Sequence, residues 1–143
     1  MSQLTFSGVS NLLSKHAENL QYQTKWMLER ICNYWSNSRS KNSLIVVELR
    51  EEELYLSIPQ SRFECFSESR ITFKDNKILS EVTFFVQHND TKTAFHRVYV
   101  NADLIVNFCS YTREPDVDLE YANHFEEFFM NELIQAATQA NFL

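Results

Sequence analysis

Apolar residues recur at helical spacing along the first quarter of the chain. This periodicity predicts one long amphipathic helix that begins near Ser10, a residue that can cap a helix, and reaches Trp35. The polar run from Asn37 to Ser43 is expected to end it. About 26 residues at ~1.5 Å each would span most of a domain. The predicted apolar stripe comprises Leu13, Ala17, Leu20, Met27, Ile31 and Trp35.

In the middle of the chain, apolar and polar residues alternate as they do in β-strands. Two strands are predicted on either side of the triple acid Glu51–Glu53, which we expect to form a solvated turn, and a short third strand is predicted over 62–66. Further turns are expected at Asp75–Asn76, around Asn89–Asp90 and over Asn101–Asp103. Successive hairpins form a meander, which predicts an antiparallel sheet.

Helical spacing returns at the end of the chain. Pro115 and Asp116 are expected to start this helix because proline suits a first turn. The residues predicted to face the sheet are Ala122, Phe125, Phe129, Leu133, Ala136 and Ala137, and those predicted to face outward are Glu120, Glu127, Asn131 and Gln135. The fold class is therefore α+β, with an antiparallel meander sheet of five or six strands flanked by a long N-terminal and a C-terminal helix in two layers. Residues 1–143 are expected to form a single domain.

Composition narrows the function classes. The formal net charge is -6, which argues against a nucleic-acid binder and is compatible with a basic protein partner. Phosphate-cradling loops need several glycines so that backbone N–H groups can approach the ligand, and the chain has one, Gly8. We therefore expect no nucleotide cofactor, and no other cofactor is indicated.

Cysteine usage and hydropathy indicate a compartment. Cys32, Cys65 and Cys109 are odd in number and form no CxxC motif, so neither a disulfide framework nor a zinc knuckle is expected. The N-terminal segment lacks the basic and apolar regions of a signal peptide. No stretch reaches the roughly 18 apolar residues of a membrane span. These features predict a reduced, soluble, cytoplasmic protein with no membrane partner.

Residues capable of catalysis or metal binding are scattered along the sequence. His88 and His96 are offset across their predicted hairpin, and His124 has Glu120 and Glu127 within one helical turn. Such a helix face is more often a solvated one than a metal site, so no metal and no catalytic residue are predicted. A small hydrolase that joins His96, His124 or Cys109 to a carboxylate in one cleft remains an alternative.

Two aromatic residues fall on the polar side of the first helix. Tyr22 and Trp26 are four residues apart, so they are neighbours on a face that points away from the apolar stripe. Exposed Trp and Tyr ringed by polar residues are typical anchors of protein interfaces. The predicted partner-binding residues are Tyr22, Trp26, Glu18, Glu29 and Asn33, with Lys15 on the same face. One alternative is that a loop or the N-terminal segment covers the pair, for example through Phe6. Another is that the chain associates with a second copy of itself, through this helix or through an edge strand, as a homodimer.

The favoured function is that of a non-enzymatic protein-binding domain, most simply an acidic inhibitor, an immunity-type protein or a phage-encoded blocking protein. The alternative is a chaperone or assembly factor for export or secretion. The segment TKTAFHRVYVNADLIV, followed by a helix that ends in AATQANFL, resembles the strand-then-helix half of SecB-type export chaperones over at most about the last 50 residues. The glycines and prolines expected there are missing and the long first helix does not fit, so no functional residue is carried over.

Overall fold

A computed structural model of the chain describes residues 4–36, 44–108, 116–118 and 124–143. The N-terminal helix is built from three consecutive segments, α1 (Phe6–Leu12), the π-helical η1 (Leu13–Ala17) and α2 (Glu18–Ser36). The predicted cap at Ser10 is wrong, because the helix begins one turn earlier. Thr5 is the N-cap, and its Oγ1 accepts a hydrogen bond of 3.1 Å from the backbone N–H of Gly8.

The π segment changes which residues face the core. Of the predicted stripe, Leu20, Met27 and Ile31 are fully buried, but Leu13 is exposed. A π turn closes from i to i+5 rather than i+4, so it offsets the helical phase by about one residue, roughly 100°. Residues before Glu18 are therefore rotated away from the direction that a regular helix gives them. No residue of α1 or η1 is buried.

The sheet is a continuous antiparallel meander, with its strands in sequence order from β1 to β7 within the described residues. Its turns use Asp75–Asn76 and Asn89–Asp90 with positive φ, as predicted, and Glu51–Glu52 in the same way. The strands are β1 (Val46–Arg50), β2 (Glu53–Ile58), β3 (Phe63–Lys74), β4 (Lys77–His88), β5 (Thr91–Val100), β6 (Ile105–Asn107) and β7 (Asp116–Asp118), with a short 3-10 turn, η2 (Pro59–Ser61), before β3.

Two predictions about the strands and the last helix need correction. The predicted short strand over 62–66 is the first part of β3, which runs without a break into the hairpin. Asp116 does not start a helix, because Asp116–Asp118 pairs with β6 as a seventh strand, where five or six were predicted. The last helix, α3, is Phe125–Gln139 and follows His124 in a left-handed conformation. Pro115, Glu120 and Ala122 lie outside the described residues.

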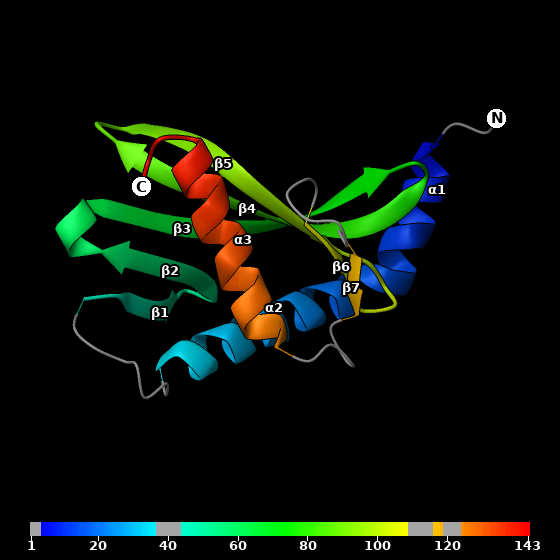
Figure 1. Cartoon of the computed structure of the whole chain (residues 1–143). Coiled ribbons are helices and arrows are strands. Elements are labelled where there is room, and N and C mark those ends of the chain that lie inside the picture. The colour runs from blue at the N-terminus through cyan, green and yellow to red at the C-terminus, as the bar shows by residue number, and fades with distance from the viewer. Residues whose placement is uncertain (1–3, 37–43, 109–115, 119–123) are drawn as a thin grey trace.

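The core lies between one face of the sheet and the two helices α2 and α3, which confirms the α+β two-layer fold (Figure 1). Phe125 and Phe129 of α3 are fully buried, as their stripe predicts, and so are Leu133 and Ala137. Phe129 makes edge-to-face contacts with Phe84 of β4 and Phe108, with ring centroids 5.8 and 5.7 Å apart. Phenylalanine therefore forms much of the contact between α3 and the sheet.

Candidate protein-binding surface

Helix α2 directs one face to the core and the opposite face to solvent. Tyr22 and Trp26 lie on the outward side because successive residues are rotated by about 100°. The side chain of Tyr22 is 69% exposed and that of Trp26 is 40% exposed. The predicted outward orientation of both residues is confirmed. The buried residues of α2 are Leu20, Thr24, Met27, Leu28, Ile31 and Cys32.

The polar members of the predicted site surround this aromatic pair. Glu18 and Asn33 are exposed and Glu29 is half-exposed on the same side of α2. Lys25 bridges two acids, with its Nζ 3.1 Å from Glu52 and 4.0 Å from Glu29. The hydrogen bond with Glu52 is the main reason that the pKa of Lys25 is raised. The five predicted residues thus share one surface, and their role in binding stays a prediction.

The structure gives no support to the alternative that Phe6 covers Trp26, because Phe6 is 91% exposed. The partial burial of Trp26 has another cause. Arg30 lies one turn further along α2, and its guanidinium carbon is 5.8 Å from the centre of the Trp26 ring and 5.4 Å from that of Phe125. These are cation–π distances. Arg30 therefore lies over the Trp26 ring, and 40% of this side chain remains exposed.

Arg30 also joins α2 to the start of α3. Its Nε lies 2.7 Å from Oε2 of Glu126, and Trp35 Nε1 donates a 3.2 Å hydrogen bond to the backbone carbonyl of Glu126. Burial alone would raise the pKa of Glu126. The hydrogen bond from Arg30, a backbone hydrogen bond, and the charges of Arg30 and His124 together outweigh it and hold this pKa below the usual value. Tyr34 donates a 2.7 Å hydrogen bond to Glu127 beside this pair. Tyr22 and Trp26 therefore lie beside a junction at which an ion pair and hydrogen bonds join α2 to α3.

Sequence reasoning missed this junction. The signal that could have found Arg30 is its spacing of four residues from Trp26, which puts the two side chains side by side on a helix. No local signal links Arg30 to Glu126, because they are far apart in the chain and meet only when both helices dock on the sheet. Tertiary pairing of this kind is invisible to periodicity.

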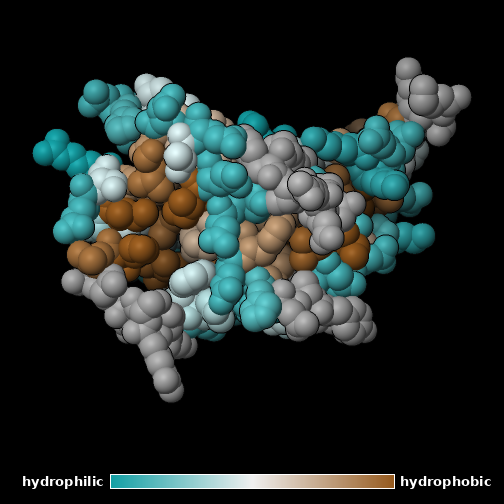
Figure 2. Space-filling view, viewed as in Figure 1, coloured by the Kyte–Doolittle hydropathy of each residue, from teal (hydrophilic) through white to brown (hydrophobic). Residues whose placement is uncertain are grey.

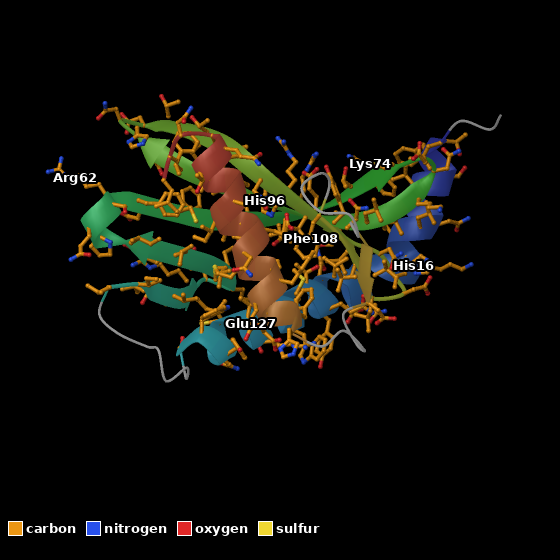
Figure 3. All side chains as sticks on the ribbon, in the orientation of Figure 1. His16, Arg62, Lys74, His96, Phe108 and Glu127 are labelled. Carbon is orange, nitrogen blue, oxygen red and sulfur yellow. The ribbon has the colours of Figure 1, made fainter. Side chains whose placement is uncertain are left out.

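The two histidines of the hydrolase alternative that the structure describes lie in different environments. His96 is 4% exposed, and burial lowers its pKa to about 4, whereas His124 is exposed, with its Nδ1 3.9 Å from Glu127. Figure 3 shows His96 apart from Glu127, the acid that lies beside His124. Burial raises the pKa of the Cys65 thiol to about 12, which leaves little thiolate for nucleophilic attack. Cys109 lies outside the described residues.

Among the residues that the structure describes, no three or more His, Cys, Asp or Glu side chains are grouped so that they could hold a metal ion. Within those ranges, no helix combines the length and the hydrophobicity needed to cross a membrane. No family model, no curated protein and no solved structure matches the chain.

Proposed function

We propose that this chain is a non-enzymatic protein-binding domain that docks on a basic protein through the Tyr22–Trp26 face of α2. The observation that carries the proposal is the exposure of these two aromatic residues directly opposite the buried stripe of the helix. Leaving them in water forgoes about 1–3 kcal/mol for each large side chain, which an interface recovers. Trp and Tyr in such a position are the commonest interface anchors.

The net charge of -6 supports a basic partner, because opposite charge steers encounter and suppresses wrong partners. A stable scaffold with one complementary surface is all that an inhibitor requires. The proposed role is therefore that of an acidic inhibitor, an immunity-type protein or a phage-encoded blocking protein.

The test compares affinity capture from the source cell by the wild-type chain, by the Tyr22→Ala/Trp26→Ala variant and by Phe6→Ala. Phe6 is the matched control, since it is an exposed aromatic residue on α1, far along the same helix. We expect partner recovery and measured affinity to fall by about ten-fold or more with the double variant, as for interface hot spots, and to be unchanged with Phe6→Ala. Undiminished affinity in the double variant would remove the basis of the proposal.

A second candidate function, that of an export or assembly chaperone, is favoured by a different surface. Hydrophobic side chains gather over β1 and β2 beside α3 (Figure 2). Val47 of β1 and Ile58 of β2 are only partly buried, and Ile45, just before β1, is 51% exposed. A chaperone that binds through this surface should suppress aggregation of an unfolded protein, and Ile45→Ser should abolish that effect. An inhibitor that binds through α2 should show no such activity.

A further inference from the structure

Strand β3 extends well beyond the strand beside it. It pairs with β4 from Phe66 to Lys74, but with β2 only from Phe63 to Phe66. Figure 1 shows the β3–β4 hairpin running past the ends of β1 and β2 toward α1. Among the described residues, no strand pairs with the β2 side of β3 from Ser67 to Lys74.

The hairpin turn determines which backbone groups point to this open side. Lys74 and Lys77 flank the two-residue turn, so they bond to each other across the hairpin. Because bonding direction alternates along an antiparallel strand, Ile71 and Phe73 point their N–H and C=O groups away from β4. Ser69 confirms this phase, since its N–H donates a 2.8 Å hydrogen bond to Oε2 of Glu53 on the open side.

Among the described residues, side chains seal the near end of the open edge but not the part at Ile71 and Phe73. The hydroxyl of Ser67 accepts a 2.9 Å hydrogen bond from the Leu54 N–H, and the Glu53 carboxylate accepts from the Ser67 and Ser69 hydroxyls at 2.7 and 3.0 Å. These contacts end where β2 ends. The edge at Ile71 and Phe73 receives no such side-chain contact among the hydrogen bonds of the described residues.

A hollow of about 380 Å³ lies along this edge and separates it from α2. Gln21 and Lys25 line its helix side, Glu51, Glu52 and Glu53 line the β1–β2 turn, and Ser69, Arg70 and Ile71 line its strand side, so the hollow reaches the first part of the edge. Strand addition needs an uncovered edge that supplies backbone hydrogen bonds and neighbouring side chains that select the guest. We call this hollow, with the edge from Ser69 to Lys74, the β3-edge groove.

The side chains of β3 define the guest that would fit. Arg70 and Lys74 are exposed on the sheet face away from the helices, where they also contact Glu81 and Tyr99 at 2.8 and 2.9 Å. A guest strand that points residues to this face would place acidic side chains beside them. On the other face, Ile71 and Phe73 are partly buried and lie opposite the buried Ser80 and Ile78, so a guest would place apolar side chains there.

We propose that the β3-edge groove binds an extended segment of another protein as an added strand, in which acidic residues alternate with apolar ones. This groove adjoins the Tyr22–Trp26 face, because Lys25 and Glu52 border both. Binding in the groove depends on the backbone of Ile71 and Phe73 and not on the two aromatic rings, so the two proposals can fail independently. The guest chemistry follows from the local charges of Arg70 and Lys74 and not from the net charge of the chain.

The probe is a blocked, fluorescent peptide of about eight residues that alternates Val and Glu, with a Val/Lys peptide of equal length as its matched control. Fluorescence anisotropy with the full chain should give at least about ten-fold tighter binding of the Val/Glu peptide. Hydrogen exchange should show the amides of Ile71 and Phe73 unprotected in the free chain and protected when the Val/Glu peptide is bound, a readout that needs no variant.

The variant Ile71→Pro removes one edge donor without touching the β3–β4 ladder, so it should abolish binding and leave the fold intact. Trp26→Ala should bind the peptide normally. Equal binding of both peptides, or protection that does not change when peptide is added, would overturn the proposal. Concentration-dependent protection of Ile71 and Phe73 without peptide would also overturn it, because a second copy of the chain would then occupy the edge.

Discussion

The free edge of β1 and the open part of the β3 edge differ in whether another element covers their outward backbone groups. Arg50 and Glu53 close the β1–β2 turn, so Val47 points its carbonyl away from β2. This carbonyl is covered by α2, because Ser36 donates a 3.1 Å hydrogen bond to it and Cys32 Sγ lies 3.9 Å away. On β3, the corresponding groups of Ile71 and Phe73 face the β3-edge groove instead.

This difference separates an edge that is closed for folding from one that is left for binding. Uncovered edges invite pairing with other chains, and proteins blunt them with covering elements or with charge. The β1 edge adjoins exposed Leu44, Ile45 and Val46, where unselective pairing would be a hazard, and there a helix covers it. The β3 edge carries Arg70 and Lys74, which repel basic strands and leave acidic ones as acceptable partners.

The largest expected effect comes from the core that holds α2 and α3 against the sheet. Phe129→Ala should destabilise the chain by about 3–5 kcal/mol, since Phe129 is fully buried among other aromatic rings. Chemical denaturation measures the loss, with Phe6→Ala as an exposed control that should cost little. As α2 loosens, the amides of β1 should exchange as fast as those of Ile71 and Phe73. A Phe129→Ala chain that melts within about two degrees of the parent would show that α3 does not carry this core.

An intermediate effect is expected at the Arg30–Glu126 ion pair, which joins α2 to α3. The pKa of Glu126 is lowered in the folded chain, because burial, which raises it, is outweighed by hydrogen bonds and charges of which the hydrogen bond from Arg30 is the largest. A carboxylate with a lowered pKa stabilises the fold above its ordinary pKa of 4.5, and this stabilisation is lost as pH falls through the lower folded value. Arg30→Gln should therefore cost about 1–2 kcal/mol at neutral pH and flatten the loss of stability in acid.

The matched control for the Arg30–Glu126 ion pair is the ion pair of Arg70 on the open edge of β3. Arg70→Gln removes a similar ion pair with Glu81, but Arg70 is largely exposed and Tyr99 and Arg97 still face Glu81. Its cost in urea denaturation should be clearly smaller than that of Arg30→Gln. Equal losses of stability for the two substitutions would mean that the Arg30–Glu126 ion pair stabilises the fold no more than an exposed ion pair does.

Periodicity predicted the long first helix, the meander and the buried stripe of α3, because these depend on neighbours in sequence. It failed where one residue changes the local geometry. The π segment turned Leu13 outward, and three residues around Val117 formed a strand where Pro115 favoured a helix start. A single extra residue in a turn carries no hydropathy signal, and a three-residue strand is too short to show one.

Of the two candidate surfaces, one could be predicted from the sequence and the other could not. The exposure of Tyr22 and Trp26 follows from their angular position on the helix, so it could be predicted from the sequence. The position of the β3-edge groove could not be predicted in this way, because it depends on β2 beginning only at Glu53 while β3 continues to Lys74. Relative strand length is fixed by pairing across the sheet, and the alternating pattern of β3 is the same whether or not a neighbour is present.

The smallest effect tests the two edges directly through two serine hydroxyls. Ser36 bonds to the carbonyl of Val47 in a partly buried position, whereas the Ser69 hydroxyl bonds to Glu53 in an exposed one. Ser36→Ala should cost about 1 kcal/mol, because the carbonyl is left without that donor, and Ser36→Thr, which keeps the hydroxyl, should cost less. Ser69→Ala should cost no more than about 0.5 kcal/mol, since water replaces the lost bond. Urea denaturation of the three variants measures these differences, and sedimentation at rising concentration shows whether the Ser36→Ala chain now associates. A Ser69→Ala chain that loses more stability than Ser36→Ala would reverse the comparison, because the β3 edge would then be the one that the fold depends on closing.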